Sequence, residues 1–332
     1  MQFPAKIVLP VAAVLLWAAA SNVLGKPVPA QNRNRITIMG TADFGGQFEL
    51  DEEGARGWSV LKTYADRVKR NRINGASRAF LFHTGDLSGL SLNPHDNPDS
   101  KHAIDVLERQ GVDLLQYTGF DAVAVRKAEE TDLSGAGAGT WPSLVRFRAN
   151  EALMLDRPEV SRPFRIWDAS GPFVWLSAVE PPSDQTELAE QITSLKSEIW
   201  KNRAAEVIVL LFAQRTRAIS HDESETAPSI EFGDWLKGFR EDVGNPYHPL
   251  PAESRDQFPY NKILILVAGE RGFFRLSDGI TVCRIPSGEI CQVELDFRQN
   301  RKSITQHWIS LSEDQRTYQF IPADPGLEKI LH

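Results

Sequence analysis

Two aspartates stand where acid or metal chemistry is usually done. Asp43 follows the apolar residues 36–39 and precedes two glycines, and Asp86 follows Gly85 just after the apolar residues 79–82. In α/β proteins, ligands gather in the loops beyond the carboxyl ends of strands. Carboxylates in such loops can act as hard oxygen ligands for a cation. The alternative is two ordinary turns, since Asp and Gly are common turn residues.

A third segment repeats the arrangement. Gly-Phe-Asp-Ala at 119–122 opens an apolar stretch that runs into a charged loop ending at Glu129. In order, spacing and flanking apolar residues, the three segments resemble the calcineurin-like metallophosphoesterases, and specifically their secreted 5'-nucleotidase and sugar-nucleotide hydrolase branch. That family has a D-x-H loop, then G-D, then G-N-H-E after a G-Y/F-D-A strand. The resemblance covers residues 35–330, with weak anchors at 214–260.

The resemblance implies a two-metal hydrolase site. Two cations roughly 4 Å apart hold the attacking and leaving oxygens and lower the pKa of a bridging water. In the family, D-x-H supplies two ligands, G-D supplies the bridging carboxylate, and the Asn of G-N-H-E binds the second metal. The His of G-N-H-E acts on the phosphate. A later His after an apolar strand and two more in G-H-x-H complete the ligands.

Most of these ligands are replaced in the first three motifs. Asp43 and Asp86 are kept, but Gly45 stands at the first His position. Lys127 replaces the Asn, and Ala128 replaces the catalytic His. The sequence therefore assigns no catalytic residue.

The later motifs are replaced as well. Ala213 stands where a His would follow the apolar residues 207–211, and Gly269-Glu270-Arg271-Gly272 replaces G-H-x-H. Only the two aspartates remain from the expected set, with Glu270 as an oxygen substitute. A residual single-metal site would therefore consist of Asp43, Asp86 and Glu270.

Positive charge enters the same motifs. Lys127, with Arg126 and Arg271, brings cations to positions that served metal ions. Like charges a few Å apart repel by roughly 4 kcal/mol at an effective dielectric near 20. A lysine at this position would therefore compete with a divalent metal. Two carboxylates at adjacent strand ends need a compensating charge where cations are lost, so we expect Lys127 to lie within ion-pair distance of Asp43 or Asp86. The alternative is a loop lysine that points to water.

The remaining polar motifs indicate no second site. None of the seven histidines fits a ligand position, and four of them are interpreted as solvated or structural: His83, His95, His102 and His221. His83 facing the cleft is the alternative. The glycine-rich residues 134–139 lack the Lys and Ser/Thr of a phosphate-binding loop, so they are interpreted as a plain loop.

Composition limits the partners and the domain count. The 332 residues are 42% hydrophobic and carry a net charge of −7. This length supports one large domain or two smaller ones, and the resemblance favours one domain over residues 35–330, without the second, substrate-binding domain of larger nucleotidases. A dispersed negative charge argues against a nucleic-acid partner.

The amino terminus has the pattern of an export signal. Lys6 precedes the apolar residues 7–20, and small residues follow near 21–25. We expect residues 1–25 to be a cleaved signal peptide and residues 26–34 a linker, with the mature protein periplasmic or extracellular. An uncleaved amino-terminal anchor is the alternative, although the apolar run is short for a span.

The two cysteines flank a turn. Cys283 and Cys291 lie on either side of Pro-Ser-Gly at 286–288, so two strands folded about Ser287 would place them opposite each other. A cross-strand disulfide would suit an oxidising compartment. The alternative is two free thiols on neighbouring strands.

The pattern of apolar residues predicts the elements of an α/β protein. Helices are expected at 57–72 and 187–203, short helices near 101–110 and 112–118, and a hairpin over 162–178. Further strands are expected at 122–125, 145–150, 207–212 and 263–267, and within 279–310. The fold class is α/β, a metallophosphoesterase fold of two packed mixed sheets flanked by helices.

These observations favour an exported, 5'-nucleotidase-like protein that is catalytically degenerate and retained for binding or a structural role. One alternative is an active phosphoesterase with an atypical single-metal site, which would need a divalent metal ion. Another is a scaffold without a ligand. No cofactor is expected for the degenerate protein, and a small phosphate, a nucleotide or a protein partner would suit it. Nothing in the sequence selects among them.

Overall fold

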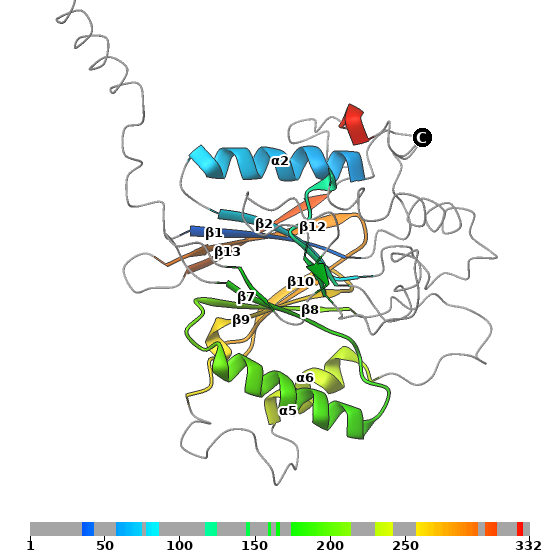
Figure 1. The fold of residues 1–332 in the computed structure, drawn as a ribbon, viewed down its shortest axis with the longest axis vertical. Coiled ribbons are helices and arrows are strands. Elements are labelled where there is room, and N and C mark those ends of the chain that lie inside the picture. Colours follow the sequence, from blue (N-terminus) through cyan, green and yellow to red (C-terminus); the bar gives the residue numbers. More distant parts are fainter. Residues whose placement is uncertain are drawn as a thin grey trace, which may run out of the picture.

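The computed structural model describes residues 35–42, 58–74, 78–85, 117–124, 144–146, 159–160, 164–166, 174–213, 230–241, 257–297, 303–310 and 324–327. Two β-sheets lie face to face, and helices cover their outer faces (Figure 1). The predicted signal peptide and linker lie outside the described residues. Among the described helices, none is long and apolar enough to cross a membrane.

The first sheet has seven strands, and its middle is parallel. Its order is β13 (Ser303–Ser310), β12 (Glu289–Asp296), β1 (Arg35–Thr41), β2 (Arg78–His83), β3 (Ala122–Ala124), β4 (Leu144–Arg146) and β5 (Glu159–Val160). β1, β2 and β3 are parallel, and the other neighbours are antiparallel. Helix α2 (Trp58–Asn74) lies between β1 and β2 in sequence and covers the outer face (Figure 1).

The second sheet has six strands. Its order is β10 (Gly272–Arg275), β11 (Thr281–Ile285), β9 (Ile263–Ala268), β8 (Val207–Phe212), β7 (Val174–Val179) and β6 (Phe164–Ile166). β7, β8, β9 and β11 are parallel, and the two edge strands are antiparallel to their neighbours. Helices α5 (Gln185–Lys201) and α6 (Phe232–Glu241) cover its outer face, and the short helix η3 (Tyr260–Lys262) precedes β9.

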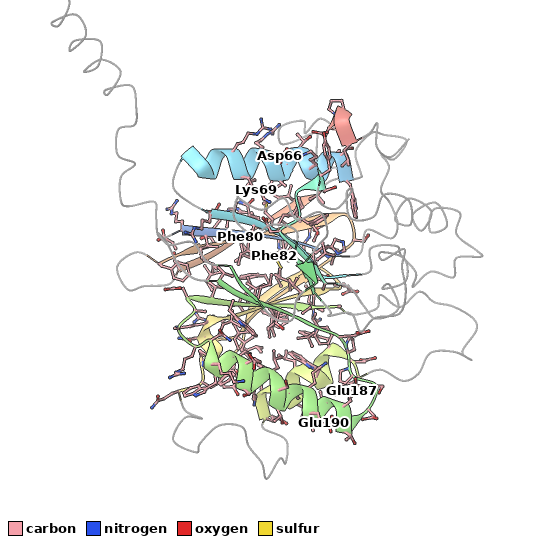
Figure 2. The ribbon with its side chains drawn as sticks, in the orientation of Figure 1. Asp66, Lys69, Phe80, Phe82, Glu187 and Glu190 are labelled. Carbon is pink, nitrogen blue, oxygen red and sulfur yellow. A yellow bond between two sulfur atoms is a disulfide. The ribbon has the colours of Figure 1, made fainter. Side chains whose placement is uncertain are left out.

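The inner faces of the two sheets form one apolar core. Strand side chains alternate between faces, and in β2 Phe80 and Phe82 point between the sheets (Figure 2). The sheets come close at Gly40 of β1. A Cβ placed there would lie 2.8 Å from a methyl of Ile285 and 2.9 Å from one of Leu266. A larger residue at position 40 would therefore force the end methyl groups of Ile285 and Leu266 to move.

A second apolar core fills the space between the second sheet and its helices. All six residues of β8 are buried, as expected of a strand covered on both faces. Phe212 at its end contacts Phe232 and Trp235 of α6, with ring centroids 5.0 Å apart in both pairs. Asp184 caps α5, because its carboxylate accepts the backbone N–H groups of Thr186 and Glu187.

The structure confirms the predicted architecture and most of the predicted elements that it describes. The hairpin over 162–178 is present as antiparallel β6 and β7. Helix α6 is absent from the sequence prediction, although Phe232, Trp235 and Phe239 recur at helical spacing. The short helix near 101–110 lies outside the described residues.

The predicted hairpin about Ser287 is wrong. Cys283 lies on β11 of the second sheet, paired with Leu266 and Phe273, whereas Cys291 lies on β12 of the first sheet. Residues 286–288 carry the chain from one sheet to the other. The two cysteines form a disulfide between the sheets, with Cα atoms 7.1 Å apart, and both are fully buried. A turn motif alone does not distinguish a hairpin from a crossing between layers.

Candidate functional site

Three strand ends from both sheets meet at one place. Gly85, the residue before Asp86, adopts a φ of +106°. A Cβ placed on it would lie 3.1 Å from the carbonyl oxygen of Ala124 and 3.2 Å from the Cβ of Ala213. Gly85 therefore fits between the end of β3 and the end of β8 only because it lacks a side chain.

The end of β1 joins the same place. The backbone N–H of Thr84 donates to the carbonyl of Thr41, at 3.0 Å. The described residues just before positions 43, 86 and 125 thus lie together with Ala213. The edge at which the sequence placed its site is therefore formed by both sheets. Five of the predicted positions lie outside the described residues: Asp43, Gly45, Asp86, Lys127 and Ala128. The ion pair expected for Lys127 stays a prediction.

Ala213 brings no ligating atom to this edge. It is fully buried, and its backbone N–H donates to the carbonyl of Val179 at 2.8 Å. A Cβ placed on Gly85 would come within 3.2 Å of its methyl group. In the resembling family a His follows this strand. Here the side chain after β8 is only the methyl group of Ala213, which lies next to the backbone of Gly85.

The turn at 269–272 has changed in a different way. Glu270 is exposed. Arg271 donates twice to the carboxylate of Glu289, with Nε at 2.9 Å from Oε2, and its guanidinium lies 5.7 Å from the ring centroid of Trp308. Arg271, which the sequence offers as a cation at the metal position, thus forms an ion pair between the second and first sheets.

His83 is a structural residue on the face of the first sheet that points away from the second sheet. It is fully buried, and its ring packs edge-on against Phe120. Its Nδ1 accepts the backbone N–H of Gly85 at 3.0 Å, so the neutral ring carries its proton on Nε2. Burial lowers the pKa of His83 from 6.5 to about 3. The imidazole therefore stays neutral and holds the Gly85 turn. The other three singled-out histidines lie outside the described residues.

Asp121 is a positioning residue that the sequence reasoning passed over. Its carboxylate accepts the backbone N–H of Leu81 at 2.7 Å and the Lys69 ammonium at 2.6 Å. Lys69 also donates to the carbonyl of Gly119 at 2.6 Å, from the side of α2 that faces the sheet (Figure 2). These bonds fix the start of β3 against β2 and α2. An acidic residue just before a buried strand was the available signal.

Of the predicted metal-binding positions within the described residues, two carry no side-chain donor. Among the described residues, no group of three or more His, Cys, Asp and Glu side chains could hold a metal ion. Ala213 and Gly272 offer no side-chain donor at positions where the resembling family has histidines.

Comparison with known proteins gives a likeness in structure alone. No protein-family model matches the sequence, and no curated protein matches it. The 5'-nucleotidase of Candida albicans SC5314 superposes with a TM-score of 0.50 and 12% identity, over 89% of this chain and 56% of that one. The calcineurin-like phosphoesterase YfkN of Bacillus subtilis superposes with a TM-score of 0.49 and 13% identity, over 90% of this chain and 95% of that one. The sulfate thiohydrolase SoxB of Thermus thermophilus superposes with a TM-score of 0.49 and 11% identity, over 92% of this chain and 61% of that one.

The chain has the calcineurin-like metallophosphoesterase fold. Its two mixed sheets, flanked by helices and joined in the order described, agree with the Candida structure over most of the chain. The chain spans little more than half of that protein's length. At this identity the likeness concerns the fold, and activity must be argued from the site.

Proposed function

We propose that this protein is a catalytically degenerate relative of the 5'-nucleotidase-like phosphoesterases, retained to bind a ligand or partner. A two-metal hydrolase needs cations to activate water and to hold the phosphoryl oxygens. Position 213 carries most of this proposal. Ala213 is fully buried against Gly85, so no ligand side chain reaches the site from β8.

The changes at the other positions support the same conclusion. Gly45, Lys127 and Ala128 remove one metal ligand, a second ligand and the catalytic His from the first three motifs. Gly272 removes another ligand at the start of β10. A protein that lacks these groups together has lost both the metal ions and the proton transfer of the parent reaction.

One observation favours an active enzyme with a single metal. Glu270 is exposed at the end of β9, and no described side chain forms an ion pair with it. With Asp43 and Asp86 it would make three hard oxygen ligands. This second candidate predicts hydrolysis that depends on all three carboxylates.

Metal content and hydrolysis distinguish the two candidates. The mature protein, purified without chelators, would be analysed for divalent metals and assayed with adenosine monophosphate and an aryl phosphate, with Mg²⁺, Mn²⁺ or Zn²⁺ added. We expect less than stoichiometric metal and no turnover above the rate of the Asp43→Asn, Asp86→Asn double variant. That variant is the matched control, because it removes the last family ligands. Stoichiometric metal together with turnover that the double variant lacks would contradict degeneracy.

We also propose that the protein is exported. The charged and apolar pattern of residues 1–20 supports this, and the disulfide between Cys283 and Cys291 suits an oxidising compartment. Amino-terminal sequencing of natively expressed protein should begin near Lys26 in an extracytoplasmic fraction. Sequencing that begins at Met1 in a cytosolic fraction would overturn the proposal.

A further inference from the structure

The two sheets end in four edge strands, and one of these strands differs from the rest. β5, β6 and β10 are two, three and four residues long, whereas β13 has eight residues. Within the described part of the chain, β12 is the only strand that pairs with β13. Alternate residues of β13 therefore direct their backbone N–H and C=O groups away from the sheet, along an edge about 27 Å long.

β13 has none of the features that usually keep an edge strand unpaired. Natural proteins protect long edges with charged side chains, with Pro or with a bulge. The sequence Ser-Ile-Thr-Gln-His-Trp-Ile-Ser at 303–310 contains no Asp, Glu, Lys, Arg or Pro, and its register with β12 has no bulge from Ser303 to Ser310. An edge of this kind accepts another strand, because none of its side chains repels or blocks one.

Apolar side chains on the same side of the molecule are only partly covered. Ile304 and Trp308 of β13 and Phe273 of β10 pack on the core between the sheets, yet each stays partly exposed. The guanidinium of Arg271, just before β10, lies against the Trp308 ring, so the beginning of β10 lies near the end of β13. The core between the sheets is therefore open to a further apolar surface along this side.

The sequence of β13 suits pairing with a second copy of itself. A two-fold axis that makes two β13 strands antiparallel keeps the inward faces of both sheets on one side, so inward residues meet inward residues. With Gln306 on the axis, Ile304 of each copy lies opposite Trp308 of the other, and Thr305 lies opposite His307. The apolar pairs cover the open side of both cores, and the two Gln306 amides can donate to and accept from each other.

The neighbouring two-fold register is less favourable. With His307 on the axis, Trp308 would lie opposite Gln306 and Ile304 opposite Ser310, so neither apolar residue would meet an apolar partner. Cross-strand pairs of an aromatic and a β-branched residue stabilise a sheet, whereas these mixed pairs do not. The side chains of β13 thus select one register for a symmetric pair.

We propose that the outer edge of β13 is the interface at which two copies of this chain pair, forming one continuous sheet with Gln306 at the two-fold axis. A second copy fits better than a different protein, because the strand complements itself on its inward face and carries no charge that the axis would place opposite the same charge. The inference holds whether or not the candidate site binds metal, since β12 separates β13 from β1 and the retained aspartates follow β1 and β2.

The first test measures the mass of the mature protein by analytical ultracentrifugation over a range of concentrations. We expect a reversible dimer, with slower amide hydrogen exchange in residues 303–310 as the concentration rises. Gln306→Lys and Gln306→Glu each place two like charges opposite each other, and each should weaken dimerisation about tenfold or more. Mixing the two variants should restore dimers, because opposite charges then meet at the axis. Gln185→Lys, the same exchange at an exposed position on α5, is the matched control and should dimerise like wild type.

A cysteine at the axis gives a second test that introduces no charge. The two native cysteines are bonded to each other, so Gln306→Cys adds a single thiol. Cα atoms directly opposite in an antiparallel pair lie about 4.5–5.5 Å apart, a distance that a disulfide can span. Mild oxidation should therefore crosslink Gln306→Cys into a covalent dimer, whereas Gln185→Cys should remain a monomer on a denaturing gel.

Each outcome decides the proposal. A wild type that stays monomeric at every concentration would overturn it, whether another protein or a segment of the same chain covers β13. Dimers that survive both charged variants, charged variants that stay monomeric when mixed, or a Gln306→Cys variant that does not crosslink would also overturn it. Melting temperatures identify any charged variant that fails to fold, and in that case the crosslinking result decides.

Discussion

The two outer faces of the sandwich are held by different forces. Helix α6 lies on the second sheet through stacked and tilted rings, among them Phe212, Trp235 and Phe239. Helix α2 lies on the first sheet through directional polar contacts as well as apolar ones. Lys69 and Asp121 bind each other and the backbone, and the Tyr64 hydroxyl donates to Gln292 at 2.7 Å.

This difference follows the location of the candidate site. The loops after β1 and β2, which carry the retained aspartates, and the loop after β3 all leave the first sheet. Hydrogen bonds fix positions and directions more narrowly than apolar area does. We infer that polar contacts on the outer face of the first sheet orient its strand ends, whereas the ring cluster on the outer face of the second sheet contributes mainly apolar stability. The predictions below test that division.

The largest loss is expected from the ring cluster. Trp235→Ala removes a fully buried indole that also donates to Gln191 at 2.8 Å, and it should lower the free energy of unfolding by about 3–5 kcal/mol. Urea denaturation measures it. Leu236→Ala, at a partly buried neighbour on the same helix, is the control and should cost clearly less. Equal costs would mean that the rings are not the main stabilising contact.

The disulfide joins the two regions, so its loss should affect both. Replacing Cys283 and Cys291 by Ala should lower stability by about 2–3 kcal/mol. Hydrogen exchange should then increase in β11 and β12 together, since the link crosses from one sheet to the other. Increased exchange in only one strand would argue that the sheets are held at this point by packing alone.

Much of the second sheet could be predicted because burial on both faces leaves a continuous apolar run, as in residues 207–212. The crossing at Ser287 could not be predicted, since a Pro-Ser-Gly turn suits either a hairpin or a change of sheet and only distant pairing decides. The meeting of Gly85, Ala124 and Ala213 depends on both sheets being stacked. The resemblance placed these positions at one site, but the contact itself required the fold.

Removing the polar contacts of Asp121 should have a smaller, more local effect on stability. Asp121→Ala leaves the Leu81 N–H and the Lys69 ammonium without their acceptor, and the expected cost is about 2 kcal/mol. Asp66→Ala is the matched control on α2. Among the described residues its side chain pairs with Lys62 at i, i+4, and losing this pair should cost no more than about 0.5 kcal/mol. If both variants behave alike, Asp121 has no special positioning role.

The effect that is smallest at pH 5.5 and above depends on pH. The pKa of His83 is lowered to about 3 in the folded protein against 6.5 unfolded, so the unfolded chain binds the extra proton between these values. The contribution of neutral His83 to the free energy of unfolding is fully present above pH 6.5. It falls as the pH drops towards 3, by about 1.4 kcal/mol at pH 5.5. His83→Asn keeps a side-chain acceptor for Gly85 and does not titrate. Its unfolding free energy should lack this component of the pH dependence. A variant with the wild-type pH profile would exclude His83 as its source.

The strand order also sets the sequence in which the molecule can assemble during synthesis. Strands β6 to β11 come from one stretch, residues 164–285, so the second sheet needs no part of the chain outside it. The first sheet pairs β1 with β12, and Arg35 binds Asp296 across 261 positions. Until residues 289–296 emerge from the ribosome, one edge of β1 lacks its partner strand. β1 can pair with β2 earlier, but its other edge is covered only after residues 289–296 are made, so the first sheet is completed after the second.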